Sequence, residues 1–109
     1  MIKLAARRMS TRSRGGLGRI NPATSALFLC DLQEKFAPII SHFDGVVSNS
    51  NRVLHAAKIF DLPVLATEQY PKGLGRTVPE LEIAKYGIKP YEKTCFSMVL
   101  YELMSELGK

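Results

Sequence analysis

The pattern of apolar and polar positions predicts two strands separated by a helix. The apolar run Ser25–Cys30 has strand length and is typical of a strand buried on both faces of a parallel sheet. A second such run, Pro63–Thr67, follows a segment of helical periodicity over residues 44–60. The apolar face of that helix is formed by Val46, Val47, Val53, Leu54, Ala57 and Phe60. Strand, helix and strand in this order predict a right-handed βαβ unit, and hence an α/β fold with a parallel sheet.

Shorter elements are expected around this unit. Leu32–Ile40 is expected to form a helical turn, and Asp44 to cap the next helix by accepting hydrogen bonds from backbone N–H groups. Tyr70–Glu82 is a loop rich in proline and glycine, and its length suggests a role beyond connection. Pro90–Met98 is predicted to be extended, and Val99–Leu107 to be a short helix with one apolar face.

The net charge of +5 is concentrated at the N-terminus. Six of the fifteen basic residues precede residue 20, and no acidic residue precedes Asp31, which leaves nine basic against ten acidic residues in the body of the chain. The body therefore lacks the excess of positive charge that nucleic-acid binding requires, and we expect no nucleic-acid partner. No stretch approaches the roughly 18 consecutive apolar residues of a membrane-spanning helix, so no membrane association is expected either.

Residues 1–22 are expected to be a flexible basic extension, and 23–109 to form the folded part. The extension is rich in Arg and Ser/Thr and free of acid, a composition typical of a mitochondrial transit peptide. The alternative is an extension without a targeting role, in a cytoplasmic protein. The two cysteines and two histidines lack the spacing of a metal site, and without a secretory signal no disulfide is expected.

A carboxylate follows the first predicted strand directly. In open parallel sheets, ligands bind beyond the carboxyl ends of the strands, which is where Asp31 and the pair Thr67-Glu68 lie. A buried carboxylate is costly unless a positive or hydrogen-bonding group meets it, and we expect Lys93 to be that partner. Spacing alone leaves open that Asp31 caps the following turn and that Lys93 is a solvated surface residue.

Three ordered blocks, LFLCDLQEKF, PVLATEQYPKGLGRTVPEL and YEKTCFSM, resemble the isochorismatase-like hydrolase family, which includes the isochorismatase domain-containing proteins of animals. The resemblance covers residues 25 to the C-terminus. It implies a Rossmann-like three-layer fold with a parallel sheet and an Asp–Lys–Cys triad that hydrolyses small amides or related bonds through a covalent acyl-enzyme. Isochorismatase itself cleaves a vinyl ether without the cysteine.

By matching motifs, the resemblance assigns the catalytic aspartate to Asp31 and the catalytic lysine to Lys93. It implies a small-molecule substrate, and neither a metal ion nor a cofactor is expected. Assembly with identical or different chains is a further expectation. Four residues are expected to surround the substrate pocket: Gln33, Phe36, Thr67 and Tyr70.

The third member of the triad is the point where this sequence departs from the family. The family's nucleophilic cysteine lies on a later strand after a glycine-rich turn, whereas only sixteen residues follow Lys93 here. We therefore expect the N-terminal part of an isochorismatase-like domain, truncated after the first βαβ unit and the lysine-bearing segment, and inactive alone.

The sequence contains two cysteines that are candidates to replace the missing nucleophile. Cys95 lies two positions from Lys93 and would share its side of an extended segment, although ordinary packing is the alternative. Cys30 is expected to point away from Asp31 because successive strand residues face opposite ways. The strand Ser25–Cys30 is central in the family's sheet, so its exposed edge here suggests the alternative of a non-catalytic interaction module that pairs through this edge.

Overall fold

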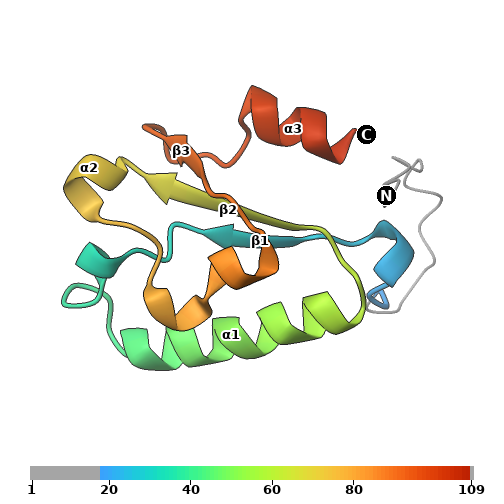
Figure 1. Ribbon diagram of the computed structural model, residues 1–109, viewed down its shortest axis with the longest axis horizontal. Coiled ribbons are helices and arrows are strands. Elements are labelled where there is room, and N and C mark those ends of the chain that lie inside the picture. Colours follow the sequence, from blue (N-terminus) through green and yellow to red (C-terminus); the bar gives the residue numbers. More distant parts are fainter. Residues whose placement is uncertain (1–17, 109) are drawn as a thin grey trace.

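The computed structural model describes residues 18–108 and shows a three-stranded parallel sheet between helical layers (Figure 1). Helix α1 (Phe43–Ile59) covers one face, and α3 (Tyr101–Leu107) lies on the other side. The sheet has the order β1-β2-β3. Its strands and the short helices are η1 (Pro22–Thr24), β1 (Leu27–Cys30), η2 (Glu34–Phe36), β2 (Val64–Gln69), α2 (Pro71–Leu74), η3 (Pro79–Leu81), η4 (Ile83–Tyr86) and β3 (Tyr91–Lys93). The predicted α/β class with a parallel sheet is confirmed.

Most of the extension predicted over residues 1–22 lies outside the described residues. At its end, the Asn21 side chain accepts a hydrogen bond from the backbone N–H of Ala23 and caps η1. This short helix spans the predicted boundary between residues 22 and 23. Among the described residues, no helix has the length and apolar character needed to cross a membrane.

Strand β2 runs two residues further than its apolar run predicts. It pairs in parallel with β1, ending at Cys30↔Thr67, and with β3, ending at Gln69↔Lys93. The two added residues, Glu68 and Gln69, are polar, but both have hydrogen-bond partners in the folded chain. Polar residues can extend a strand when such partners exist, and apolar periodicity does not reveal them.

Helix α1 forms where its periodicity predicts, although its cap differs. The N-cap is His42, which has a left-handed backbone (φ 54°), and the Asp44 side chain does not cap the helix. Asp44 lies in the first turn instead, where a carboxylate still interacts favourably with the helix dipole. The predicted apolar face divides into a buried and an exposed part: Val47, Leu54 and Ala57 are buried, whereas Val46, Val53 and Phe60 are exposed.

The hydrophobic core lies between α1, the sheet and the segment that carries η3. It consists of Leu29, Phe43, Val47, Leu54, Ala66, Val78 and Leu81. Strand β1 was predicted to be buried on both faces, and this is wrong: only Leu29 of its residues is buried. The reason is that β1 lies at an edge of the described sheet and pairs with β2 alone.

The C-terminal elements are shorter than expected. Of the extended stretch predicted over residues 90–98, only Tyr91–Lys93 pairs as a strand, because the chain bends directly after Lys93. The last helix begins at Tyr101, two residues later than its apolar pattern suggested. The loop Tyr70–Glu82 contains α2 and η3, and the short helix η4 that follows it was not predicted.

Two neighbouring residues of α1 test this description of the core. Leu54 is fully buried, whereas Val53 is 52% exposed on the same helix. Leu54→Ala is expected to lower the free energy of unfolding by about 2–5 kcal/mol. Val53→Ala is expected to have a much smaller effect, because its side chain leaves no comparable cavity. Denaturant unfolding of both variants measures the difference, and equal losses would contradict the assignment of the core.

Candidate functional site

A buried ion pair lies where the three parallel strands end. The Lys93 ammonium, from the last residue of β3, is 2.7 Å from Oδ2 of Asp31, which directly follows β1. The Lys93 side chain is 0% exposed and that of Asp31 is 16% exposed. The predicted pairing of these two residues is confirmed, and the alternative of a solvated Lys93 is wrong.

The Lys93 ammonium donates only to oxygen atoms. Besides Asp31, the acceptors are Oε1 of Gln69 at 2.9 Å and the backbone carbonyls of Cys95 at 2.9 Å and Phe96 at 3.2 Å. A buried charge is tolerated only when such partners replace water. The acceptors come from the segments that end all three strands, so this one ammonium links the strand ends.

The Asp31 carboxylate is held at both oxygens. Its Oδ1 accepts a hydrogen bond of 2.7 Å from the Thr67 hydroxyl, while Oδ2 faces Lys93. The backbone of Asp31 is left-handed (φ 51°), and so is that of Tyr70 (φ 37°), which directly follows β2. Such conformations are costly for residues other than glycine and concentrate at functional sites. The two residues with a strained backbone, Asp31 and Tyr70, thus lie at the same strand ends as the ion pair.

The four residues expected around a substrate pocket have different positions. Thr67 contacts Asp31 but is itself buried, and Tyr70 is exposed at the end of β2. Gln33 is 0% exposed and Phe36 is partly buried against the hydrophobic core, so the position of both next to a substrate stays a prediction. The Gln33 amide hydrogen-bonds the backbone of β2, whereas Phe36 of η2 is only partly buried against the core.

Cys30 lies beside the ion pair, contrary to expectation. Its register partner is Thr67, so both side chains project from the same face of the sheet. Because the Asp31 backbone is left-handed, the alternation of an extended strand ends there, and the carboxylate returns to this face, where it contacts Thr67. Burial and the negative charge of Asp31 raise the pKa of the Cys30 thiol, outweighing the opposing charge of Lys93. At neutral pH the thiol is therefore protonated.

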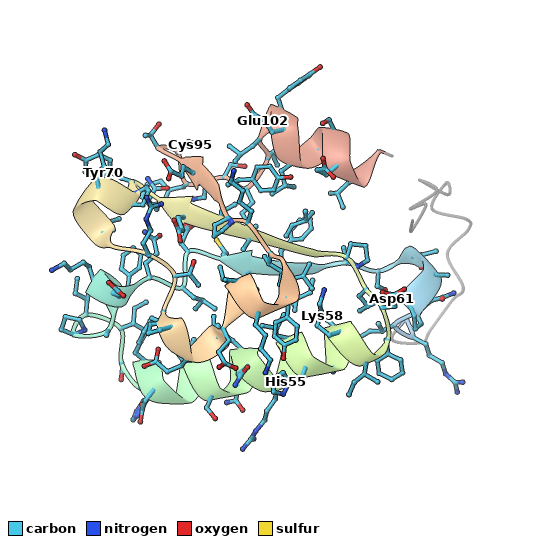
Figure 2. All side chains as sticks on the ribbon, viewed as in Figure 1. His55, Lys58, Asp61, Tyr70, Cys95 and Glu102 are labelled. Atoms are coloured by element: carbon cyan, nitrogen blue, oxygen red, sulfur yellow. The ribbon has the colours of Figure 1, made fainter. Side chains whose placement is uncertain are left out.

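Cys95 does not present its thiol to the ion pair. Its carbonyl oxygen accepts from Lys93, whereas its Sγ interacts with the carbonyl of Ser97 at 3.5 Å. Its expected orientation toward the side of Lys93 is wrong because β3 ends at Lys93 and the chain bends. Figure 2 shows Cys95 at the same end of the sheet as Tyr70, with His55 and Lys58 well away on α1.

A second polar cluster lies on the opposite face of the same strand end; the sequence placed Glu68 at this end, but its partners Thr77 and Arg76 were not predicted. The buried carboxylate of Glu68 accepts hydrogen bonds from the backbone N–H and hydroxyl of Thr77 at 2.9 Å, and from Arg76 at 3.0 Å. Burial raises the pKa of Glu68, but the bonds from Thr77 and Arg76 together lower it below its ordinary value. Glu68 follows an apolar run as Asp31 does, which was the available signal.

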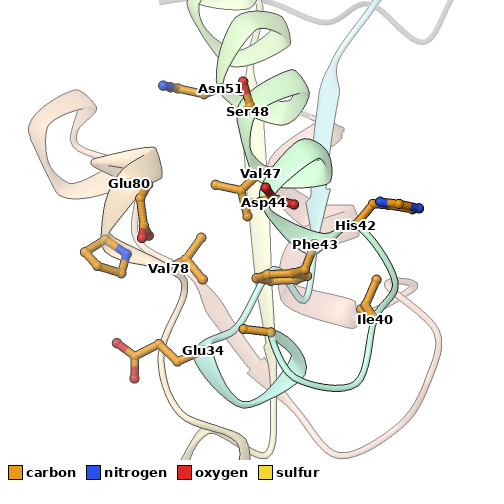
Figure 3. A pocket seen from close by; sticks show the side chains of 12 residues that line it. Glu34, Ile40, His42, Phe43, Asp44, Val47, Ser48, Asn51, Val78 and Glu80 are labelled. Carbon is orange, nitrogen blue, oxygen red and sulfur yellow. The ribbon is translucent and has the colours of Figure 1, made fainter.

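A hollow beside α1 is separate from the ion pair. A cavity of about 900 Å³ opens between η2, the start of α1 and η3, with Phe43, Val47 and Val78 at its base (Figure 3). Neither Asp31 nor Lys93 lines it. Within residues 18–108, no group of three or more His, Cys, Asp or Glu side chains could hold a metal ion.

The position of Cys30 can be tested through its reactivity. In a Cys95→Ala variant, iodoacetamide should alkylate Cys30 with a pH midpoint above the value of about 8.5 for an ordinary thiol. Asp31→Asn should lower this midpoint, because it removes the negative charge that disfavours the thiolate. The rates are followed by mass spectrometry, with the same variant unfolded in urea as the control. Identical midpoints in the folded and unfolded protein would contradict the geometry.

Comparison with known proteins shows which family this chain is similar to. The Isochorismatase domain family matches residues 25–107. Isochorismatase domain-containing protein 2A of Mus musculus is 59% identical over 87 residues, covering 80% of this chain and 41% of the mouse protein. The human Isochorismatase domain-containing protein 2 is 53% identical, with 80% and 42% covered. A solved structure described as MAR1 ribonuclease from Caenorhabditis elegans has a TM-score of 0.73 and 47% identity, and covers 82% of this chain and 47% of that chain. The chain spans less than half the length of these relatives, and it belongs to the isochorismatase domain family.

Proposed function

We propose that this chain carries the acid–base part of a cysteine hydrolase site that acts on small amides or related substrates. The buried pair of Asp31 and Lys93 at the carboxyl ends of the strands is the observation that supports this proposal most directly. A carboxylate next to a buried cation can accept a proton and is held in a fixed position while it does so. The nucleophilic thiol would come from the part of the domain that the relatives have and this chain does not span.

In the proposed reaction, the Asp31 carboxylate takes the proton of that thiol, and the thiolate attacks the substrate carbonyl carbon. The new C–S bond forms, the C–N bond breaks, and protonated Asp31 returns the proton to the leaving amine. Water then attacks the thioester and gives a proton to Asp31. The carboxylic acid product leaves, and the released thiolate recovers this proton. Lys93 keeps the carboxylate oriented and balances the negative charge of the site.

Neither local cysteine is proposed as this nucleophile. The raised pKa of Cys30 disfavours its thiolate, and the Sγ of Cys95 faces Ser97. Nor do we propose an RNA substrate, although one related structure is described as a ribonuclease. In this chain Lys93 is paired with Asp31, and Arg76 with Glu68 and Glu92, so these cations are already neutralised.

A chimera tests the proposed function. Residues 25–107 of this chain would replace the matching part of the mouse relative, and hydrolysis of a panel of small amides would be measured. Asp31→Asn should lower kcat/KM by about 10²–10⁴-fold, the usual effect of losing a general base. The exposed residue Asp44 provides the matched control, since Asp44→Asn should leave kcat/KM unchanged. A folded chimera whose hydrolysis does not depend on Asp31 would overturn the proposal.

A second candidate function is supported by the exposed edge of β1. Phe28 is 44% exposed and, with Val46 and Val53 of α1, lines an open cavity of about 480 Å³ along this edge. An unpaired strand edge beside apolar side chains is a template for pairing with another chain. We propose that the chain by itself associates through this edge, as an interaction module.

Sedimentation velocity tests the second candidate. The isolated chain should form larger species as its concentration rises, and Phe28→Lys should shift the distribution toward the monomer because a charged edge residue opposes strand pairing. Ile59 is 81% exposed on α1 and does not line the cavity, so Ile59→Lys is the control and should leave association unchanged. A wild-type chain that stays monomeric at every concentration contradicts this candidate.

A further inference from the structure

We propose that Gln33 is a positioning residue for the Asp31–Lys93 pair, because its buried amide takes the place of a missing strand beside Gln69, the residue that binds Lys93. The role of the ion pair in this inference rests on the proposed function. In this inference Gln33 acts through Gln69 and the Asp31 backbone and makes no contact with the Lys93 ammonium itself.

The first step concerns the backbone groups of β2 that lose their partner where β1 ends. In β2, the backbone N–H and C=O groups of Thr67 face β1, and Asp31 donates its N–H to the Thr67 carbonyl at 3.2 Å. Gln69 lies two residues further along β2, so its N–H and C=O face the same side. There β1 has already ended, because its pairing stops at Cys30 and the left-handed Asp31 turns the chain away. Without another partner, both backbone groups of Gln69 would lack a hydrogen bond within the protein at a partly buried position.

The second step is that the Gln33 side chain supplies both missing partners. Its Oε1 accepts the Gln69 N–H at 2.6 Å, and its Nε2 donates to the Gln69 carbonyl at 2.8 Å. The other N–H of Nε2 donates to the Gly75 carbonyl at 2.8 Å, which also fixes the loop after α2. Only an amide side chain of this length offers one acceptor and two donors in this arrangement.

The third step connects this contact to the ion pair. The register Gln69↔Lys93 places both side chains on one face, and Oε1 of Gln69 accepts from the Lys93 ammonium at 2.9 Å. Gln33 also donates its backbone N–H to the carbonyl of Asp31 at 2.9 Å. Gln33 therefore contacts the backbone of Asp31 and Gln69, the two residues whose side chains accept hydrogen bonds from the ammonium. Its loss should let the ammonium move without removing any group from the pair itself.

Glu68→Gln is the control variant that distinguishes a positioning effect on Lys93 from a general loss of stability. Glu68 is also buried, precedes Gln69 and ties β2 to the same loop, but its bonds go to Thr77 and Arg76 on the other face. Replacing either Gln33 or Glu68 should therefore destabilise the fold by a similar mechanism, the loss of a buried hydrogen-bond partner. Only a change at Gln33 should alter the surroundings of Lys93.

The experiment observes the Lys93 ammonium by ¹H–¹⁵N NMR of the full chain, because a buried, hydrogen-bonded ammonium exchanges slowly enough to give a signal. The signal is assigned by its absence in Lys93→Arg. Gln33→Met is expected to shift or broaden it beyond detection, whereas Glu68→Gln should leave it in place. Gln69→Met removes the linking oxygen and should change the signal as Gln33→Met does, with no further change in the double variant. An unchanged signal in Gln33→Met overturns the inference.

Two further readouts keep the inference testable if Gln33→Met does not fold. Gln33→Glu retains the acceptor for the Gln69 N–H and should give an intermediate signal. In the unaltered chain, the Gln69 amide should exchange as slowly as amides within β2, and rapid exchange there overturns the proposal without any variant. These measurements do not require hydrolysis, so a chimera without activity would refute the proposed function and leave this inference standing.

Discussion

In the part of the chain that the structure describes, the arrangement of the strand ends depends on one buried positive charge. The ammonium of Lys93 is removed from water, and transferring such a charge into a protein interior costs several kcal/mol unless other groups replace its hydration. Asp31, Gln69 and two backbone carbonyls provide this replacement. Because these groups lie at the ends of different strands, the charge can be accommodated only when all three strands are assembled. Folding of the sheet and formation of the candidate site are therefore one event.

The α1 side of the sheet and the carboxyl ends of its strands are stabilised by different physical means. On the side of α1, residues such as Leu29, Leu54 and Ala66 form an apolar core, where stability follows from buried area and close packing. At the carboxyl ends of the strands, polar side chains such as Gln33 and Glu68 satisfy backbone groups and charges one by one. Packing tolerates a change of shape better than a hydrogen-bonded network tolerates the loss of one member. The positions of side chains are therefore fixed most precisely at the strand ends.

The sequence allowed the fold class and part of the site to be predicted. Apolar periodicity located β1, α1 and β2, and the cost of burying Asp31, together with the family resemblance, identified Lys93 as its partner. The orientation of Cys30 was not predictable in the same way, because the alternation rule assumes an extended backbone and Asp31 is left-handed. The burial of Gln33 also escaped prediction, since its partners lie more than thirty residues away and leave no periodic signal.

The short length of β3 has a consequence for the alignment of the sheet. Three residues provide too few backbone contacts to define by themselves how β3 lies against β2. A slip of one residue would turn Lys93 to the opposite face, toward α1 and away from Asp31. An ammonium without a partner in that apolar layer would make the misaligned sheet unstable. The ion pair therefore also selects the correct register of β3. The charge that forms part of the candidate site destabilises a sheet in which β3 is shifted by one residue.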